Sequence, residues 1–213
     1  MWVPSAGMAG DGRARHWDGV YTRTDATQVS WFEPDPVCSL ELLDIGGANP
    51  DVGLIDVGAG ASRLVDVLLA RGFTDLTALD VSDDGLALSR QRLGADAARV
   101  RWVVADLLDW VPDRRFGAWH DRAVFHFLTD PADRARYREL VAAALAPGAL
   151  MVIATFAGDG PQQCSGLPTA RYSAAELAAE LGGALEVVAD RREQHRTPWG
   201  AVQPFTWLAV RRW

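Results

Sequence analysis

A glycine turn after a short apolar run is the segment of this chain best suited to bind a ligand. Residues 54–62 read Leu-Ile-Asp-Val-Gly-Ala-Gly-Ala-Ser, a predicted strand that turns at Gly58 and Gly60 into a predicted helix. Glycines let the backbone turn tightly and let a ligand approach the peptide groups without meeting a Cβ. A dinucleotide-binding G-x-G-x-x-G fingerprint would need its third glycine at position 63, where this chain has Arg63. The spacing therefore disfavours a nicotinamide dinucleotide.

Acidic residues stand near the ends of four predicted strands. Asp56 lies just before the glycine turn, and Asp80, Asp106 and Asp121 follow three further apolar runs. The carboxyl ends of parallel strands line one crevice, in which ligands of open α/β sheets bind. A carboxylate at Asp80 could accept hydrogen bonds from both hydroxyls of a ribose. Capping of the following helix would explain any one of these aspartates, but it explains the set of four less well.

Strand-like and helix-like segments alternate from residue 53 onward. This alternation predicts right-handed crossovers and a doubly wound α/β fold, with a mostly parallel sheet covered by helices on both faces. The predicted strands are residues 53–57, 76–80, 100–105, 118–121, 150–156, 185–190 and 205–210. The predicted helices are residues 62–71, 83–93, 131–145 and a segment that begins at a capping box, Ser173–Glu176. A loop of about 15 residues joins the last two strands, which should form a hairpin and make one edge strand antiparallel.

Residues 1–45 precede the alternating pattern and are rich in aromatic side chains, among them Trp17, Tyr21 and Trp31. Such a segment is too aromatic for a disordered tail. We expect it to form a helix and an ordered lid segment that pack over one end of a core domain, residues 46–213. The length favours a single domain overall.

The composition excludes several chemistries. The 213 residues include no Lys, which rules out Schiff-base, pyridoxal-phosphate and P-loop lysine chemistry. The formal net charge of -7 opposes binding to nucleic acid. Cys38 and Cys164 lie far apart and outside any Cys/His cluster, so we expect no metal site and no disulfide framework.

Two features of the sequence favour a cytoplasmic protein that does not enter a membrane. Residues 1–12 lack the apolar run that a signal peptide needs. The uncharged stretch 140–158 is interrupted by Pro147–Gly148, which predicts a helix, a turn and a buried strand rather than a membrane span.

Four motifs together resemble those of class I, seven-β-strand S-adenosylmethionine-dependent methyltransferases. Asp56–Ser62 is similar to the family's D/E-x-G-x-G-x-G motif, with Ser62 where a third glycine is usual. Leu79–Ser82 and Ala105–Leu107 resemble the second and third motifs. His120–Ala123 resembles the D-R-G/A segment of thiopurine/thiol methyltransferase-like and lysine methyltransferase-like members. The family fold is Rossmann-like, with a seven-stranded sheet whose last strand is antiparallel.

This resemblance implies a set of cofactor-binding residues for S-adenosylmethionine and its product, S-adenosylhomocysteine. Asp80 and Val81 would hold the ribose, and Asp106 and Leu107 the adenine. Asp121 would lie near the sulfonium and could bind the amino group. The residues implied at the methionine portion, with an aromatic lid residue over the sulfonium, are Asp56, Gly58, Ala59, Gly60, Ser62 and Trp31.

Acceptor-side candidates follow from position. His126 comes five residues after Asp121, and its ordinary pKa near neutrality suits a general base, with Asp121 as a second catalytic candidate. A structural hydrogen bond from His126 on a helix face is the alternative. The further residues expected to contact the acceptor are Tyr21, Phe125, Arg171 and Tyr172.

The sequence thus predicts methyl transfer to the S, N or O atom of a small molecule by in-line displacement. A protein side chain such as lysine is the alternative acceptor. More distant alternatives are an NAD(P)-dependent oxidoreductase, disfavoured by Arg63 and the missing Lys, and a non-catalytic nucleotide-binding module.

Overall fold

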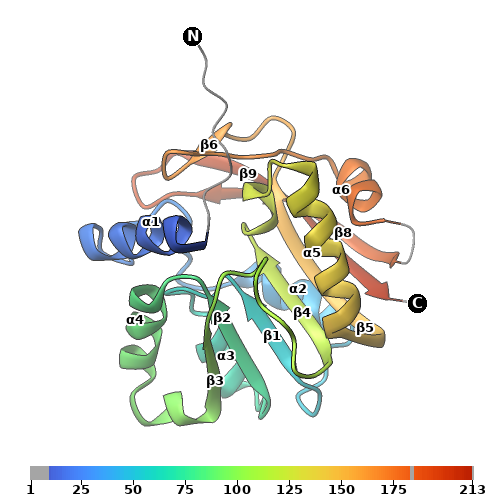
Figure 1. Cartoon of the computed structure of the whole chain (residues 1–213), viewed down its shortest axis with the longest axis horizontal. Helices are drawn as coiled ribbons and strands as arrows, with labels where there is room; N and C mark the ends of the chain where they lie inside the picture. The colour runs from blue at the N-terminus through green and yellow to red at the C-terminus, as the bar shows by residue number, and fades with distance from the viewer. Residues whose placement is uncertain (1–9, 183–184, 213) are drawn as a thin grey trace.

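Seven of the strands that the structure describes form one sheet, in the order β3-β2-β1-β4-β5-β9-β8 (Figure 1). The computed structural model describes residues 10–182 and 185–212. Most of residues 1–12, for which the sequence predicts no signal peptide, lies outside the described residues. The strands are β1 Leu54–Val57, β2 Leu76–Asp80, β3 Val100–Val104, β4 Phe116–Arg122, β5 Leu145–Phe156, β8 Leu185–Arg196 and β9 Val202–Arg212. Strands β1 to β5 pair in parallel, and β9 runs antiparallel to both of its neighbours. The predicted α/β architecture and its antiparallel last strand are therefore confirmed.

The C-terminal hairpin differs from the prediction in two respects. Strand β9 inserts between β5 and β8, so the antiparallel strand is not at the edge of the sheet. Both strands are also longer than predicted, and only residues 197–201 connect them. Charged residues in the second half of β8 obscured its length, because an edge strand can leave most of its side chains in solvent.

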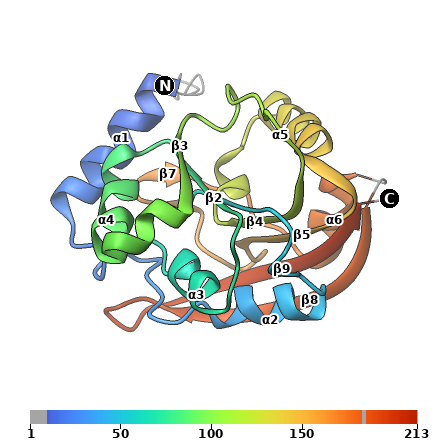
Figure 2. The same cartoon turned by 90° about the horizontal axis from the view of Figure 1, so that it is seen from below.

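Helices cover both faces of the sheet, as Figure 2 shows from a second side. The bounds are α1 Gly10–Arg23, α2 Val37–Ile45, α3 Leu64–Ala70, α4 Asp83–Leu93, α5 Pro131–Ala144 and α6 Ala174–Leu181. Short 3-10 turns span Gly94–Arg99 and Phe125–Phe127, and a two-stranded hairpin pairs β6 Gln163–Cys164 with β7 Leu167–Pro168. In the described residues, no helix combines the length and apolar character that crossing a membrane requires.

Local sequence signals begin several of these helices. The Ser82 side chain accepts the Gly85 N–H at the start of α4, and Asp130 accepts the Ala132 N–H at the start of α5. The capping box at Ser173 begins α6. The predicted turn at Pro147–Gly148 is present as an irregularity in the β4–β5 ladder, where pairing passes from Phe116–Leu145 to Ala118–Leu150.

The core has one apolar cluster on each face of the sheet, because side chains alternate along every strand. Leu54 and Ala118 join residues of α2, α3 and α4 in the first cluster. Ile55 and Trp119 join residues of α5 and α6 in the second. This alternation decides which aspartates can reach the ligand crevice.

The N-terminal segment contains two helices with different positions. Helix α1 packs beside α4, where Ser82 Oγ donates to Asp18 Oδ1 over 2.7 Å. Helix α2 instead packs against the face of the sheet near β5, β8 and β9. The sequence prediction did not separate α2 as a second helix.

Candidate active site

The main cavity of the described residues lies at the carboxyl ends of β1, β2, β3 and β4. The strand order reverses between β1 and β4, which is where open α/β sheets bind ligands. Gly58, Asp80 and Asp106 line this cavity, as do Val81 and Leu107. The structure thus brings together the predicted contributions of three strands.

The glycine turn requires glycine at two positions. Gly58 and Gly60 have φ of 69° and 41°, in the left-handed region that side chains disfavour. A Cβ on Gly58 would lie 2.1 Å from Val124 Cγ2, and one on Gly60 would lie 2.2 Å from the Tyr21 hydroxyl. The turn therefore packs directly beneath the segment after β4 and beneath α1.

Asp80 is buried and holds the turn through backbone hydrogen bonds. Its Oδ2 accepts the Gly60 N–H and its Oδ1 accepts the Ser82 N–H, each over 2.8 Å. Burial raises the pKa of Asp80 to about 6, although both hydrogen bonds act in the opposite direction. The side chain is mostly ionised at neutral pH and can accept further hydrogen bonds from a ligand.

Asp106 forms an ion pair across the cavity with helix α1. Arg13 Nε lies 2.5 Å from Asp106 Oδ2, and Asp106 Oδ1 accepts the Leu108 N–H. Arg13, Trp17 and Tyr21 are spaced four residues apart on α1 and all line the cavity. One face of α1 therefore covers the site predicted to lie under the N-terminal segment.

An aromatic cluster closes the same side. The ring of Trp17 lies 5.6 Å from that of Trp31 and 5.2 Å from that of Phe127, each in an edge-on arrangement. The Tyr21 ring lies 6.3 Å from Trp31. Trp31 and Tyr21, both predicted at the site, line the cavity wall.

A second, smaller cavity adjoins the first and is lined by other residues of the glycine motif, whereas Gly60 lines neither cavity. Asp56, Ala59 and Ser62 line it, together with Gly58, which both cavities share. His120 Nδ1 lies 2.7 Å from Asp56 Oδ1, and His120 Nε2 lies 2.9 Å from Ser39 Oγ. Asp56 Oδ2 is buried without a partner among the described residues, so it remains available to a donor in this cavity.

Asp121 does not line either cavity. It faces α5, where its Oδ2 accepts the Tyr137 hydroxyl over 2.6 Å and its Oδ1 accepts the N–H groups of Val124 and Phe125. Burial raises its pKa to about 6. These three donors come from the protein itself, so Asp121 positions the segment after β4 instead of contacting a ligand.

His126 lines the cavity, but its environment does not suit a general base. The Phe156 N–H donates to His126 Nδ1 over 3.4 Å, which places the proton of a neutral ring on Nε2. Burial, aided by the charge of Arg122, lowers the pKa of His126 to about 3. The ring is therefore neutral near pH 7 and would donate from Nε2, contrary to the predicted role.

Three other predicted acceptor residues lie away from the cavity lining. Phe125 packs its ring 4.8 Å from Tyr137 on the α5 side of the sheet. Arg171 donates to the Gly160 carbonyl, and the half-buried Tyr172 lies beside Phe125. The prediction placed them by their proximity in sequence to strand ends, whereas strand alternation and the loop path turn them elsewhere.

The structure adds cavity residues that the sequence prediction did not assign. They include Arg13 on α1, Arg122 at the end of β4, Phe127 in the segment after β4, Phe156 at the end of β5, Cys164 on β6, and Gln203 and Phe205 on β9. Arg122 stands inside the recognised D-R-A segment, so that motif could have indicated it. Gln203 and Phe205 carry no local signal, because they reach the site only through the β5–β9 pairing.

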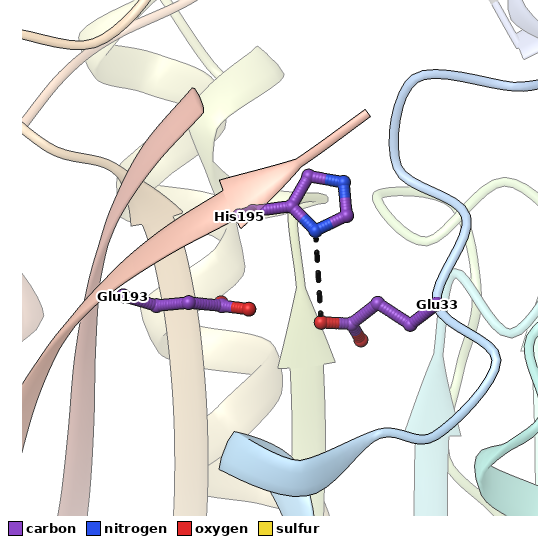
Figure 3. A group of neighbouring side chains, drawn as sticks. All are labelled: Glu33, Glu193 and His195. Carbon is purple, nitrogen blue, oxygen red and sulfur yellow. Dashed lines mark ion pairs between the residues drawn. The ribbon is translucent and has the colours of Figure 1, made fainter. Parts of the chain in front are cut away.

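Two partly buried glutamates and a buried histidine lie beside Arg122. Glu33, Glu193 and His195 each offer an atom within 4.8 Å of the others, and Figure 3 shows Glu33 and Glu193 extending toward each other beside His195. A guanidinium nitrogen of Arg122 lies 3.1 Å from Glu33 and 3.4 Å from His195 Nδ1. The guanidinium of Arg122 therefore supplies the positive charge that a metal ion would supply beside these side chains, and we assign no metal to them.

Comparisons with known proteins agree with this geometry. Residues 54–148 match the family model described as a methyltransferase domain. The trans-aconitate 2-methyltransferase of Sinorhizobium medicae (strain WSM419) is 33% identical over 106 residues, which is 49% of this chain and 38% of that relative. The matched part thus spans well under half of the relative's length.

Two solved structures have a similar fold at low sequence identity. The N-methyltransferase NodS of Bradyrhizobium japonicum, in complex with S-adenosylhomocysteine, is 17% identical with a TM-score of 0.70, over 94% of this chain and 98% of its own. The 1,6-didemethyltoxoflavin-N1-methyltransferase of Burkholderia thailandensis is 21% identical with a TM-score of 0.68, over 99% and 93%. Residues 54–148 therefore match a methyltransferase domain model, and the described chain shares its fold with these two methyltransferase structures.

Proposed function

We propose that this chain is an S-adenosylmethionine-dependent methyltransferase that acts on a small-molecule nucleophile. The observation that carries the proposal is the meeting of Asp80, Asp106 and the left-handed turn at Gly58 and Gly60 at one crevice. The solved structures of similar fold include one with bound S-adenosylhomocysteine and one with that product and an acceptor.

The residues present fit this cofactor. Asp80 would accept hydrogen bonds from the ribose hydroxyls, and Asp106 with Leu107 would contact the adenine. The unpartnered, buried Oδ2 of Asp56 in the adjoining cavity suits the ammonium group of the methionine portion. When bound, S-adenosylmethionine supplies a methyl carbon activated by its sulfonium. The acceptor lone pair would attack this carbon in line with, and opposite to, the sulfur that leaves.

The chain's own residues would contribute mainly alignment and exclusion of water. Well-oriented groups can account for about 7–11 kcal/mol of a barrier. Trp17 and Trp31 line the cavity, and an indole face turned toward the bound sulfonium would attract its positive charge. Since His126 is a weak base and Asp121 is turned away, we propose an acceptor atom that already has a lone pair available at neutral pH.

A small acceptor is favoured over a protein side chain by the cover on the cavity. Helix α1 lies across it and is fixed by the Arg13–Asp106 ion pair and the Ser82–Asp18 hydrogen bond. The related trans-aconitate methyltransferase and the toxoflavin-precursor methyltransferase of similar fold are named for small-molecule substrates.

Calorimetry with S-adenosylmethionine, S-adenosylhomocysteine and NADH tests the proposal. We expect S-adenosylhomocysteine to bind with a dissociation constant below about 1 mM and NADH not to bind. Asp80→Ala should weaken binding at least tenfold, since it removes acceptors for the ribose. Asp51→Asn, an exposed substitution before β1 that also removes one negative charge, is the control. The proposal is overturned if neither S-adenosylmethionine nor S-adenosylhomocysteine binds. Tight binding of the cofactor without turnover of any acceptor in a broad panel would favour a non-catalytic binding module.

A further inference from the structure

The part of the cavity beyond the glycine turn has mostly aromatic walls. Phe156 and Phe205 are partners across the β5–β9 pair, and their ring centres lie 4.9 Å apart. Phe127 and Trp31 close this part from the segment after β4 and from the N-terminal segment. Because β5 and β9 lie on the other side of β4 from β1, β2 and β3, these rings border space that the cofactor-binding strands do not reach.

The cations that line the cavity are already paired within the described residues. Arg13 pairs with Asp106, and Arg122 pairs with Glu33 over 3.1 Å. Arg122 also donates to the Trp31 carbonyl over 2.9 Å and lies 4.9 Å over the Phe205 ring. A carboxylate-rich acceptor would have to break one of these pairs to be neutralised, and its own desolvation would oppose binding.

Three buried polar atoms of cavity residues have no partner among the described residues. They are His126 Nε2, Gln203 Oε1 and Arg122 Nε. The hydrogen bond from the Phe156 N–H to Nδ1 makes His126 Nε2 a donor, and Arg122 Nε is a donor as well. Gln203 Oε1 is an acceptor. Buried polar groups in folded proteins are normally hydrogen-bonded, so these atoms point to a ligand that supplies the missing partners.

We infer that the acceptor is an uncharged, planar aromatic or heteroaromatic molecule that accepts a hydrogen bond from His126 and donates one to Gln203. This inference rests on the proposed function and adds the substrate class. The aromatic walls match the flat faces of such a molecule, and a ring carbonyl or ring nitrogen beside an N–H or O–H supplies partners for two of the three atoms, His126 Nε2 and Gln203 Oε1. Methyl transfer then forms a bond from the acceptor's S, N or O lone pair to the methyl carbon as the carbon–sulfur bond breaks. S-adenosylhomocysteine leaves, and any acceptor proton passes to solvent.

The test uses the full chain saturated with S-adenosylhomocysteine and compares two probes that share a ring system. The hydroxyquinoline is 4-hydroxyquinoline, which is neutral and carries a carbonyl and an N–H in its keto form, whereas a quinoline dicarboxylate carries the same rings and two negative charges. Trans-aconitate serves as a non-aromatic polyanion. We expect the hydroxyquinoline to bind at least tenfold more tightly than either anion by calorimetry, with turnover of neutral heteroaromatics in the presence of S-adenosylmethionine.

Two variants test the assigned polar contacts. Gln203→Leu and His126→Phe should each weaken hydroxyquinoline binding about tenfold and leave the affinity for S-adenosylhomocysteine within about twofold. Gln194→Leu, an exposed substitution on the neighbouring strand β8, should change neither affinity. Should His126→Phe fail to fold, Gln203→Leu still decides the question.

Tighter binding of trans-aconitate or the dicarboxylate, or equal hydroxyquinoline binding in Gln203→Leu, would overturn the inference. So would a complex that holds S-adenosylhomocysteine but binds no neutral heteroaromatic probe. Failure to bind S-adenosylhomocysteine at all would instead overturn the proposed function, so the two failures are distinguishable.

Discussion

Replacing Glu33 by Gln is expected to stabilise the folded chain at neutral and higher pH. The Glu33 side chain is 15% exposed and lies beside Arg122, Glu193 and His195. Burial raises its pKa from 4.5 to about 7, although Arg122 acts in the opposite direction and Glu193 adds to the increase. The folded chain therefore binds a proton at Glu33 more tightly than the unfolded chain does.

This difference sets both the sign and the size of the effect. Because the folded-state pKa is raised, the stabilisation linked to this proton is complete below pH 4.5 and is lost as the pH rises through about 7. A pKa difference from 4.5 to about 7, at about 1.4 kcal/mol per pKa unit, corresponds to about 3 kcal/mol. Gln mimics the protonated side chain and keeps an oxygen for Arg122, so the variant should not undergo this loss.

Urea unfolding followed by tryptophan fluorescence, repeated from about pH 4 to about pH 8, measures the effect. The two proteins should have similar free energies of unfolding at the acidic end, and Glu33→Gln should be the more stable by up to about 3 kcal/mol at the basic end. Glu139→Gln, whose side chain is 71% exposed, is the matched control and should show no such trend. A variant that is less stable than wild type at high pH, or a difference that does not vary with pH, would refute the reasoning.

Three further substitutions have expected outcomes. Gly58→Ala should weaken S-adenosylhomocysteine binding at least tenfold by calorimetry, since its Cβ would lie 2.1 Å from Val124 Cγ2. Gly72→Ala is the control: it also places a side chain at a positive φ, of 90°, but has nothing within 4 Å of its Cβ, so it should bind normally. Wild-type affinity for S-adenosylhomocysteine should fall by up to tenfold per pH unit below about pH 6, where Asp80 becomes protonated. Asp80→Asn should show weak binding with a flat pH profile, and a wild-type profile flat from about pH 7 to about pH 5 would contradict this role. Tyr137→Phe, which removes the 2.6 Å hydrogen bond to Asp121, should lower the free energy of unfolding by about 1–3 kcal/mol in urea titration, whereas an unchanged value would contradict it.

Much of the cofactor half could be predicted from local patterns. Asp80 ends the buried strand β2 and Asp106 follows the partly exposed edge strand β3 of the parallel part of the sheet, and both line the crevice as expected. Asp121 follows a strand just as closely but faces α5, because it shares the side of β4 on which Trp119 packs. Side chains alternate between the two faces of a strand, so assigning each strand's buried face first could have distinguished Asp121 from the aspartates that line the crevice.

The acceptor half was much less predictable. Gln203 and Phe205 depend on β9 pairing with β5, a contact between segments about 50 residues apart, for which the sequence shows no local period. The role of His126 depended on burial, which lowers its pKa and cannot be derived from the identity of the residue. The pairing of Arg122 with Glu33 likewise joins β4 to the N-terminal segment, and only the three-dimensional structure brings them together.

The insertion of β9 between β5 and β8 also sets an order of assembly during translation. Strands β1 to β4, with the glycine turn and both crevice carboxylates, leave the ribosome well before the hairpin that carries Gln203 and Phe205. A nascent chain generally organises its earlier segments first. The nucleotide-binding half can therefore begin to form while the part of the acceptor wall that β9 contributes is still missing. A truncation before Val202 would remove the strand that pairs with the edge of β5 and, in the same step, take Gln203 and Phe205 from the pocket, so an unpaired strand edge would accompany an incomplete acceptor pocket.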